Sequence, residues 1–170
     1  FTNYELLNEI VKTGKPFFCS TGMSTETEIM ETKSFLDKKG ANYALLHCNS
    51  TYPTPFKDVN LLYLKRMAKL TGNIVGYSGH ERGVAIPIAS IAIGAKVIEK
   101  HITVDKKLEG TDHKVSLLPN ELIDMVLQIR MVEESLGSDT AQRVLTQGEM
   151  INRENLAKSI VSTKKINKGE

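Results

Sequence analysis

NIVGYSGH, residues 73–80, and the later segment KVIEKH, residues 96–101, decide the fold. Each is a short, largely apolar run rich in β-branched residues that ends on polar side chains and a histidine. A strand buried on both faces of a parallel sheet has this pattern, because it turns polar only where it leaves the sheet. Ligands bind at the carboxyl ends of such strands in α/β sheets and barrels. We therefore expect His80 and His101 at one rim of a parallel sheet.

Composition excludes several other classes. The chain has 170 residues, 41% of them apolar, which suffices for the core of one domain. Acidic and basic residues are interspersed and sum to +2, so we expect no nucleic-acid partner. The sequence has no apolar run of membrane-spanning length and no signal-peptide pattern, so we expect no membrane association and a cytoplasmic location. Cys19 and Cys48 are expected as buried free thiols, and the start at Phe1 suggests a piece of a longer protein.

Helical and strand patterns alternate along the chain. Capping boxes at 2–5 and 25–28 predict helices that stop at Gly14 and Gly40, and Asp58 is expected to cap a helix that ends before Gly72. Further helices are predicted at 84–93 and from Pro119 to Leu136, and strands at 16–19, 43–48, 73–80 and 96–101. This order predicts an α/β fold with parallel strands, either half of a (β/α)₈ barrel or a flavodoxin-like open sheet.

The two histidines have two interpretations. They are either core imidazoles with satisfied hydrogen bonds or metal ligands, and Glu99 shares a strand face with His101 because side chains alternate along a strand. Two imidazoles with water or substrate oxygens in the other positions suit Mn²⁺ or Mg²⁺ better than structural zinc.

Other polar residues also follow predicted strands. Ser20, Ser50 and Ser78 either serve turns and caps or form a cradle for a phosphate or carboxylate. Asp112 is either a solvated loop residue or the partner of a sugar hydroxyl, and Tyr52 is either a packing aromatic or part of a site.

Five segments in this order resemble the sialic acid synthase (N-acylneuraminate synthase) family, over essentially the whole chain. They are KPFFCSTGM (15–23), LLHCNSTYPTP (45–55), GYSGHERG (76–83), IEKHITVDKKLEGTDHKVSL (98–117) and KSIVSTKKINKGE (158–170). The resemblance implies strands five to eight of a (β/α)₈ barrel over 1–138, a linker over 139–156, and the first strand and turn of an antifreeze-like domain over 157–170.

The resemblance also implies roles for individual residues. His80 and His101 match the metal ligands, with Glu99 close by as a catalytic group that acts on bound water. Ser20, Ser50 and Ser78 match positions that hold phosphoenolpyruvate, although some members have asparagine at the position of Ser50. Tyr52 and Asp112 match positions that contact the amino sugar. The family's lysines and a carboxylate lie upstream of Phe1, and an arginine from a partner's antifreeze-like domain lies beyond Glu170.

The activity implied is condensation of phosphoenolpyruvate with N-acetylmannosamine or its 6-phosphate, in a metal-dependent homodimer. Synthesis of a related legionaminic- or pseudaminic-type acid is the alternative within enzymes, and a non-catalytic scaffold or carbohydrate-binding module is the alternative outside them. We expect the chain alone to be inactive, with its strands 16–19, 45–48, 74–77 and 97–98 exposed, because half a barrel leaves two unpaired edges.

Overall fold

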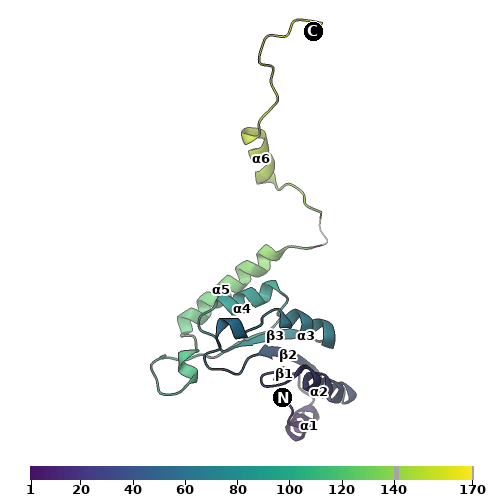
Figure 1. Cartoon of the computed structure of the whole chain (residues 1–170), viewed down its shortest axis with the longest axis vertical. Coiled ribbons are helices and arrows are strands. Elements are labelled where there is room, and N and C mark those ends of the chain that lie inside the picture. Colours follow the sequence, from purple (N-terminus) through teal and green to yellow (C-terminus); the bar gives the residue numbers. More distant parts are fainter. Residues whose placement is uncertain (140–141, 170) are drawn as a thin grey trace. The chain divides into compact units, whose positions relative to one another are not determined.

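The computed structural model describes residues 1–139 and 142–169 and is built on a four-stranded parallel sheet (Figure 1). The strands are β1 (Phe17–Ser20), β2 (Tyr43–Cys48), β3 (Val75–Gly79) and β4 (Ile98–Lys100). The α-helices are α1 (Tyr4–Lys12), α2 (Glu26–Lys38), α3 (Tyr63–Thr71), α4 (Ala85–Ala92), α5 (Pro119–Leu136) and α6 (Gln147–Leu156), and two short 3₁₀ helices cover Phe56–Asp58 and Asp112–Lys114. The chain divides into two units after Gly137, and the first holds the whole sheet.

Each strand pairs in parallel with the next strand in the sequence, in the order β1-β2-β3-β4. A flavodoxin-like sheet instead has its first strand between the second and third. The flavodoxin-like alternative is therefore wrong, and the sheet has the order of a curled half-barrel in which helices follow each strand.

The two faces of the sheet have different neighbours. Cys19, Leu45 and Tyr77 belong to the core that the strands share with the helices. Because side chains alternate along a strand, Cys48 points to the opposite face, where its register partner is Ser78. Glu99 is in turn the partner of Ser78, so these three residues form one row across the sheet.

The strands of the isolated sheet are less exposed than the sequence predicts. Leu45 and Leu46 are fully buried, although we expected the segment 45–48 to be open. Phe18 and Ile74 do remain exposed, at 63% and 60%. Leu45 is buried in the core that the strands share with the helices, and Leu46 packs against β3, where a Cβ on Gly76 would lie 2.6 Å from its side chain.

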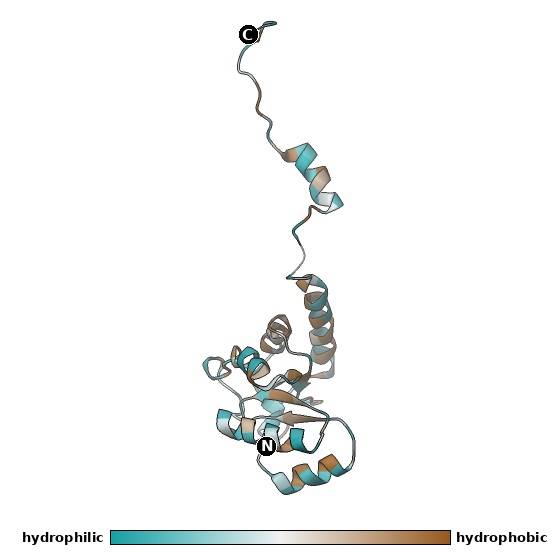
Figure 2. Cartoon of the chain, turned by 90° about the vertical axis from the view of Figure 1, so that its right-hand side faces the viewer, coloured by the Kyte–Doolittle hydropathy of each residue, from teal (hydrophilic) through white to brown (hydrophobic). Residues whose placement is uncertain are grey.

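The helices begin where local capping chemistry places them. Thr25 and Glu28 form the predicted capping box of α2. The cap of α1 is Asn3, whose side chain accepts from the backbone N–H of Leu6, so the predicted box at 2–5 is wrong by one residue. Asp58 ends a 3₁₀ helix instead of capping α3. In Figure 2 the helices carry both hydrophilic and hydrophobic residues, as expected for helices that bury one face.

The last two helices of the first unit follow the prediction closely. α5 starts at Pro119 and ends before Gly137. α4 lies within the predicted 84–93, but it is not buried all round, because the alanines at 85, 89 and 92 are exposed. Its isoleucines and Pro87 are at least half buried against the core.

The second unit contains one helix that the sequence reading missed. α6 lies inside the segment expected to be a linker, and Thr146 and Glu149 form its capping box. The strand expected within 157–170 is not formed among residues 157–169, where Ile160 is fully exposed, because no strand among the described residues pairs with this segment. Thr140, Ala141 and Glu170, which fall in the expected linker and antifreeze-like segments, lie outside the described residues. Within 1–139 and 142–169, every helix is too short or too polar to cross a membrane.

Candidate active site

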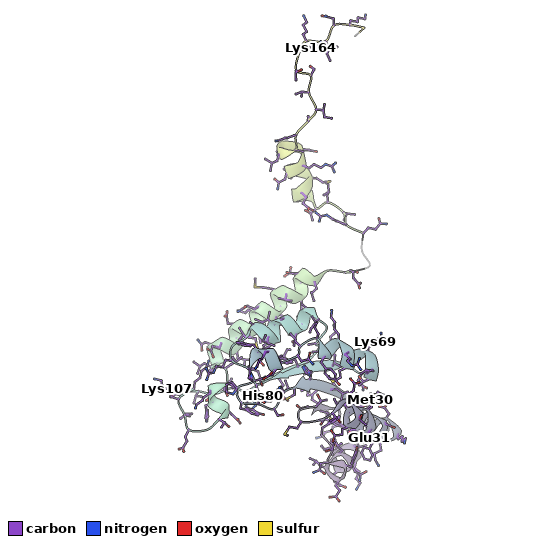
Figure 3. All side chains as sticks on the ribbon, in the orientation of Figure 1. Met30, Glu31, Lys69, His80, Lys107 and Lys164 are labelled. Atoms are coloured by element: carbon purple, nitrogen blue, oxygen red, sulfur yellow. The ribbon has the colours of Figure 1, made fainter. Side chains whose placement is uncertain are left out.

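Polar side chains gather just beyond the carboxyl ends of the strands. β3 and β4 pair up to Gly79 and Lys100, and the next residue on each segment is a histidine, His80 and His101. Figure 3 shows His80 at the end of the sheet towards the loop that carries Lys107, away from Lys69 near the end of α3. The two imidazole rings lie 5.1 Å apart, centroid to centroid, and meet edge to face. The strand-end position predicted for the pair is therefore confirmed.

Hydrogen bonds fix the orientation of the His80 ring. Its Nδ1 lies 2.8 Å from the backbone carbonyl oxygen of Asn49, and its Nε2 lies 3.0 Å from the hydroxyl of Tyr52. A carbonyl can only accept, so Nδ1 carries the proton. In the neutral ring Nε2 then holds a lone pair, which accepts from Tyr52.

Tyr52 and Asp112 both lie close to His101. The Tyr52 ring centroid is 4.1 Å from that of His80 and 5.8 Å from that of His101. A carboxylate oxygen of Asp112 lies 3.8 Å from Nδ1 of His101. Tyr52 and Asp112 come from different loops, so the fold brings both to the histidine pair.

Glu99 and Ser78 form the next layer below the histidines. The Ser78 hydroxyl donates to Oε1 of Glu99 at 2.7 Å. Ser78 is 3% exposed, while Glu99 is exposed on the face opposite the helices. The carboxylate of Glu99 is therefore held in place and still open to solvent.

Cys48 connects the serines to the histidines, a role that the sequence did not suggest. Its Sγ lies 3.7 Å from Nδ1 of His80 and 3.9 Å from the hydroxyl of Ser50. Cys19 and Cys48 are both free and buried, as predicted. The feature that could have identified Cys48 as a site residue is its register, because it ends its strand on the same face as Ser78.

Contacts at Cys48 change the acidity of both partners. Burial lowers the pKa of His80, but the thiol of Cys48 and the carbonyl of Asn49 raise it more, so the pKa lies above its ordinary value. Burial raises the pKa of Cys48, and hydrogen bonds from His80, Ser20 and Ser50 lower it more, so this pKa lies below its ordinary value.

The loops after β1 and β2 touch beside Ser50. A Cβ on Gly22 would lie 2.2 Å from the Ser50 hydroxyl oxygen and 3.1 Å from the sulfur of Cys48. The segments 21–25 and 48–51 line a cavity of about 400 Å³. Only glycine at position 22 leaves the Ser50 side chain in its place.

The histidine pair fits a divalent cation. Nδ1 of His80 is bound to a carbonyl, as in metal-ligating histidines, and its Nε2 accepts from Tyr52, so a cation at Nε2 would displace that hydroxyl. Within the described ranges, no group of three or more His, Cys, Asp or Glu side chains is arranged to hold a metal ion. The chain thus offers His80 and His101, and other ligands would be water or substrate oxygens.

The structure places every residue singled out from the sequence at this rim: Ser20, Ser50, Tyr52, Ser78, His80, Glu99, His101 and Asp112. Their roles in binding and catalysis stay predictions. The sequence reading missed Asn49 and Cys48, which orient His80, and it missed Glu81 and Lys100 beneath the two histidines.

Comparisons with known proteins identify relatives of the chain. The chain is 42% identical to the human N-acetylneuraminate-9-phosphate synthase, over 98% of the chain and 46% of that protein. It is also 42% identical to the N,N'-diacetyllegionaminic acid synthase of Campylobacter jejuni, over 99% of the chain and 51% of that protein. The chain spans about half the length of these relatives.

A solved structure has the same fold. The N-acetylneuraminic acid (sialic acid) synthetase of Leptospira borgpetersenii serovar Hardjo-bovis, crystallised with citrate, superposes with a TM-score of 0.81 and 33% identity, over 91% of this chain and 54% of that one. The NeuB family model matches residues 1–141, which include the sheet and the whole histidine rim. With the fold, the rim and these matches in agreement, the chain belongs to the NeuB family.

Proposed function

We propose that the complete protein condenses phosphoenolpyruvate with N-acetylmannosamine, or its 6-phosphate, to give N-acetylneuraminate, or its 9-phosphate, and phosphate. The observation that carries this proposal is the pair of imidazoles, His80 and His101, 5.1 Å apart at the carboxyl rim with Tyr52 against both. Relatives named as synthases of such acids support it.

The reaction forms a C–C bond and a C–O bond between C2 and the oxygen of water, and it breaks the C–O bond between C2 and phosphate. C3 of phosphoenolpyruvate attacks the aldehyde carbon of the open-chain sugar, and the aldehyde oxygen takes up a proton. Water then adds at C2, and phosphate leaves from that carbon. Glu99, whose carboxylate is fixed by Ser78 at 2.7 Å, is the proposed base that accepts the proton of this water.

In this proposal, the three serines at the rim bind phosphoenolpyruvate. Ser20 ends β1, Ser50 follows β2, and Ser78 is the next-to-last residue of β3. The hydroxyls of Ser20 and Ser50 can donate to phosphate and carboxylate oxygens, whereas the hydroxyl of Ser78 donates to Glu99 and would have to turn from it to bind the substrate. Asp112 and Tyr52 are assigned to the amino sugar. A carboxylate such as Asp112 repels the anionic substrate but accepts hydrogen bonds from sugar hydroxyls.

His80 and His101 are the proposed ligands of Mn²⁺ or Mg²⁺. When bound there, such a cation would supply Lewis-acid chemistry, which stabilises the charge that develops on the aldehyde oxygen. We also propose that the active assembly is a homodimer, in line with the expected arginine from a partner's antifreeze-like domain. The free thiols of Cys19 and Cys48 favour a reducing, cytoplasmic compartment.

A second candidate substrate has its own support. The legionaminic acid synthase relative matches with the same identity as the human enzyme, so an amino sugar with two acetamido groups is the alternative acceptor. The two acceptors share the aldehyde chemistry and differ only in the groups that the pocket must accommodate.

Phosphate release by the complete protein tests the proposal. The assay combines phosphoenolpyruvate with N-acetylmannosamine, its 6-phosphate or a diacetamido hexose, with Mn²⁺ or with a chelator. We expect turnover with one acceptor, and loss of turnover on chelation. His80→Ala with His101→Ala should abolish both turnover and Mn²⁺ binding while the fold persists. Mn²⁺ affinity that is unchanged in this double variant would refute the metal assignment.

A further inference from the structure

A buried ion pair lies next to the two histidines in the sequence. Nζ of Lys100 donates to Oε1 of Glu81 at 2.8 Å and also to the backbone carbonyl of Glu81. The side chains are 1% and 0% exposed, respectively. Because Glu81 follows His80 and Lys100 precedes His101, this pair joins the two segments that carry the imidazoles.

The strand ladder does not hold the histidines together. The register of β3 and β4 ends at Gly79 and Lys100, one residue before them. Beyond that point their backbones turn to different partners. The carbonyl of His80 accepts from Thr54, and the carbonyl of His101 accepts from Leu117. The Glu81–Lys100 ion pair thus connects two segments whose backbones diverge.

Both carboxylate oxygens of Glu81 have defined partners. The hydroxyl of Tyr77 donates to its Oε2 at 2.5 Å, while Lys100 binds the other oxygen. A Cβ on Gly79 would lie 2.8 Å from both carboxylate oxygens. Glycine at that position therefore leaves room for the carboxylate beneath the end of β3.

This pair lies on the opposite face of the strands from the Ser78–Glu99 hydrogen bond. Tyr77 belongs to the core that the strands share with the helices, and Lys100 is the register partner of Gly79, two residues further along that face. The ends of β3 and β4 are consequently connected by side-chain contacts on both faces of the sheet.

Stability alone does not account for such a pair. Removing two charges from water is costly, and replacing a buried pair by apolar residues of similar volume is often neutral or stabilising. We propose that Glu81, Lys100 and Tyr77 are positioning residues that set the separation and orientation of His80 and His101. The consequence for cation affinity rests on the proposed function, whereas the geometric role does not.

The decisive variant removes both charges at once. In the complete protein, Glu81→Met combined with Lys100→Met leaves no unpaired charge, so we expect a thermal midpoint close to that of the wild type. The Mn²⁺ dissociation constant, measured without substrates from the electron paramagnetic resonance signal of free Mn²⁺, should rise at least ~10-fold, the effect typical of losing support around metal ligands. A crystal structure of the variant should show the imidazoles displaced from their 5.1 Å contact.

A matched control uses the exposed ion pair of Glu26 with Arg66, in which two guanidinium nitrogens donate to the carboxylate at 2.7 and 2.8 Å. Glu26→Met combined with Arg66→Met should leave both the Mn²⁺ affinity and the ring separation unchanged. Tyr77→Phe removes one hydroxyl and keeps the ring, so it should fold even if the double variant does not, and should weaken Mn²⁺ binding to a smaller extent.

The possible results separate the two proposals. Imidazoles that keep their contact, together with unchanged Mn²⁺ affinity in the double variant and in Tyr77→Phe, would overturn the positioning role. If the wild type itself binds no Mn²⁺, the metal assignment fails, and the ring separation in the variant structures still decides whether Glu81 and Lys100 position the histidines.

Discussion

The hydroxyl oxygen of Tyr52 lies 3.0 Å from Nε2 of His80, and the two rings are 4.1 Å apart, centroid to centroid. Tyr52 comes from the loop after β2, whereas His80 follows β3, so this contact joins two strand ends. Because Nδ1 of the same imidazole is bound to the Asn49 carbonyl, both ring nitrogens have defined partners. Tyr52 can therefore influence the orientation of His80, and its proposed contact with the amino sugar would lie beside that histidine.

The Tyr52→Phe variant should distinguish the contribution of the hydroxyl from that of the ring. Loss of one hydrogen bond is worth about 1 kcal/mol, which corresponds to about a fivefold decrease in kcat/KM for the amino sugar. The ring contact is retained and only the hydrogen bond to His80 is lost, so the thermal midpoint should fall only slightly. Tyr43→Phe is the control, since it loses a hydroxyl contact to Asp37 at the far end of the sheet and should leave kinetics unchanged. Equal effects of the two variants would argue against a role at the site.

Asp112→Ala should raise the KM for the amino sugar and leave the KM for phosphoenolpyruvate nearly unchanged. The physical reason is charge, since a carboxylate repels the phosphate and carboxylate of phosphoenolpyruvate. Steady-state kinetics with each substrate varied in turn measures both constants, and Glu109→Ala in the same exposed loop is the control. The opposite pattern would refute the assignment. A loss of Mn²⁺ affinity would instead indicate action through His101, whose Nδ1 lies 3.8 Å from the carboxylate.

Gly22→Ala tests whether Ser50 binds phosphoenolpyruvate. The new Cβ would lie 2.2 Å from the Ser50 hydroxyl oxygen, which can rotate away because it ends a short side chain. We therefore expect a several-fold higher KM for phosphoenolpyruvate with little loss of stability. Gly148→Ala is the matched control, since a Cβ there meets no atom within 4 Å. An unchanged KM for phosphoenolpyruvate in the Gly22 variant would exclude Ser50 from that contact.

His47 should make stability depend on pH. It is 7% exposed, its Nε2 lies 2.8 Å from the Val59 carbonyl oxygen, and burial lowers its pKa below the ordinary 6.5. The native state thus takes up this proton less readily than the unfolded state. Stability is complete above pH 6.5, where both states are neutral, and falls as the pH drops from there towards the lowered pKa.

His47→Gln keeps a donor for the carbonyl and cannot titrate. Urea unfolding should show that the free energy of unfolding falls less steeply for the variant between about pH 7 and pH 5. For one proton, the two slopes should differ by at most about 1.4 kcal/mol per pH unit. Parallel pH dependences for the wild type and the variant would mean that another group dominates.

Much of the first unit was predictable because its signals are local. The capping box at Thr25, the stop at Gly72 and the start at Pro119 each depend on a few neighbouring residues. The strand ends that carry His80 and His101 were predictable for the same reason. The order of the strands was not, since a run of apolar residues does not state which strand lies beside it.

The residues that the sequence reading missed depend on contacts distant in the chain. Glu81 and Lys100 are 19 residues apart and look like ordinary surface charges until the register places them together. The role of Cys48 depends on a histidine 32 residues away. The predicted strand within 157–170 failed for a related reason, because local β propensity cannot replace a partner strand.

The 170 residues expressed alone should not catalyse the condensation. Within the described sheet, β1 and β4 each have one neighbour, so both edges present unpaired backbone groups. Phe18 and Ile74 are 63% and 60% exposed and, with Ala44 and Val97, help line a cavity of about 470 Å³. Exposed apolar surface beside open edges promotes association.

The measurement combines phosphate release with the oligomeric state in solution. We expect no turnover with phosphoenolpyruvate and N-acetylmannosamine or its 6-phosphate, and a particle larger than a monomer. Phe18→Ser with Ile74→Ser should reduce the association without restoring activity, because the substitutions remove apolar surface and add no catalytic group. A soluble, monomeric and active product would show that one half-barrel is sufficient, and that Ser20, His80, Glu99 and His101 need no further residues for the chemistry.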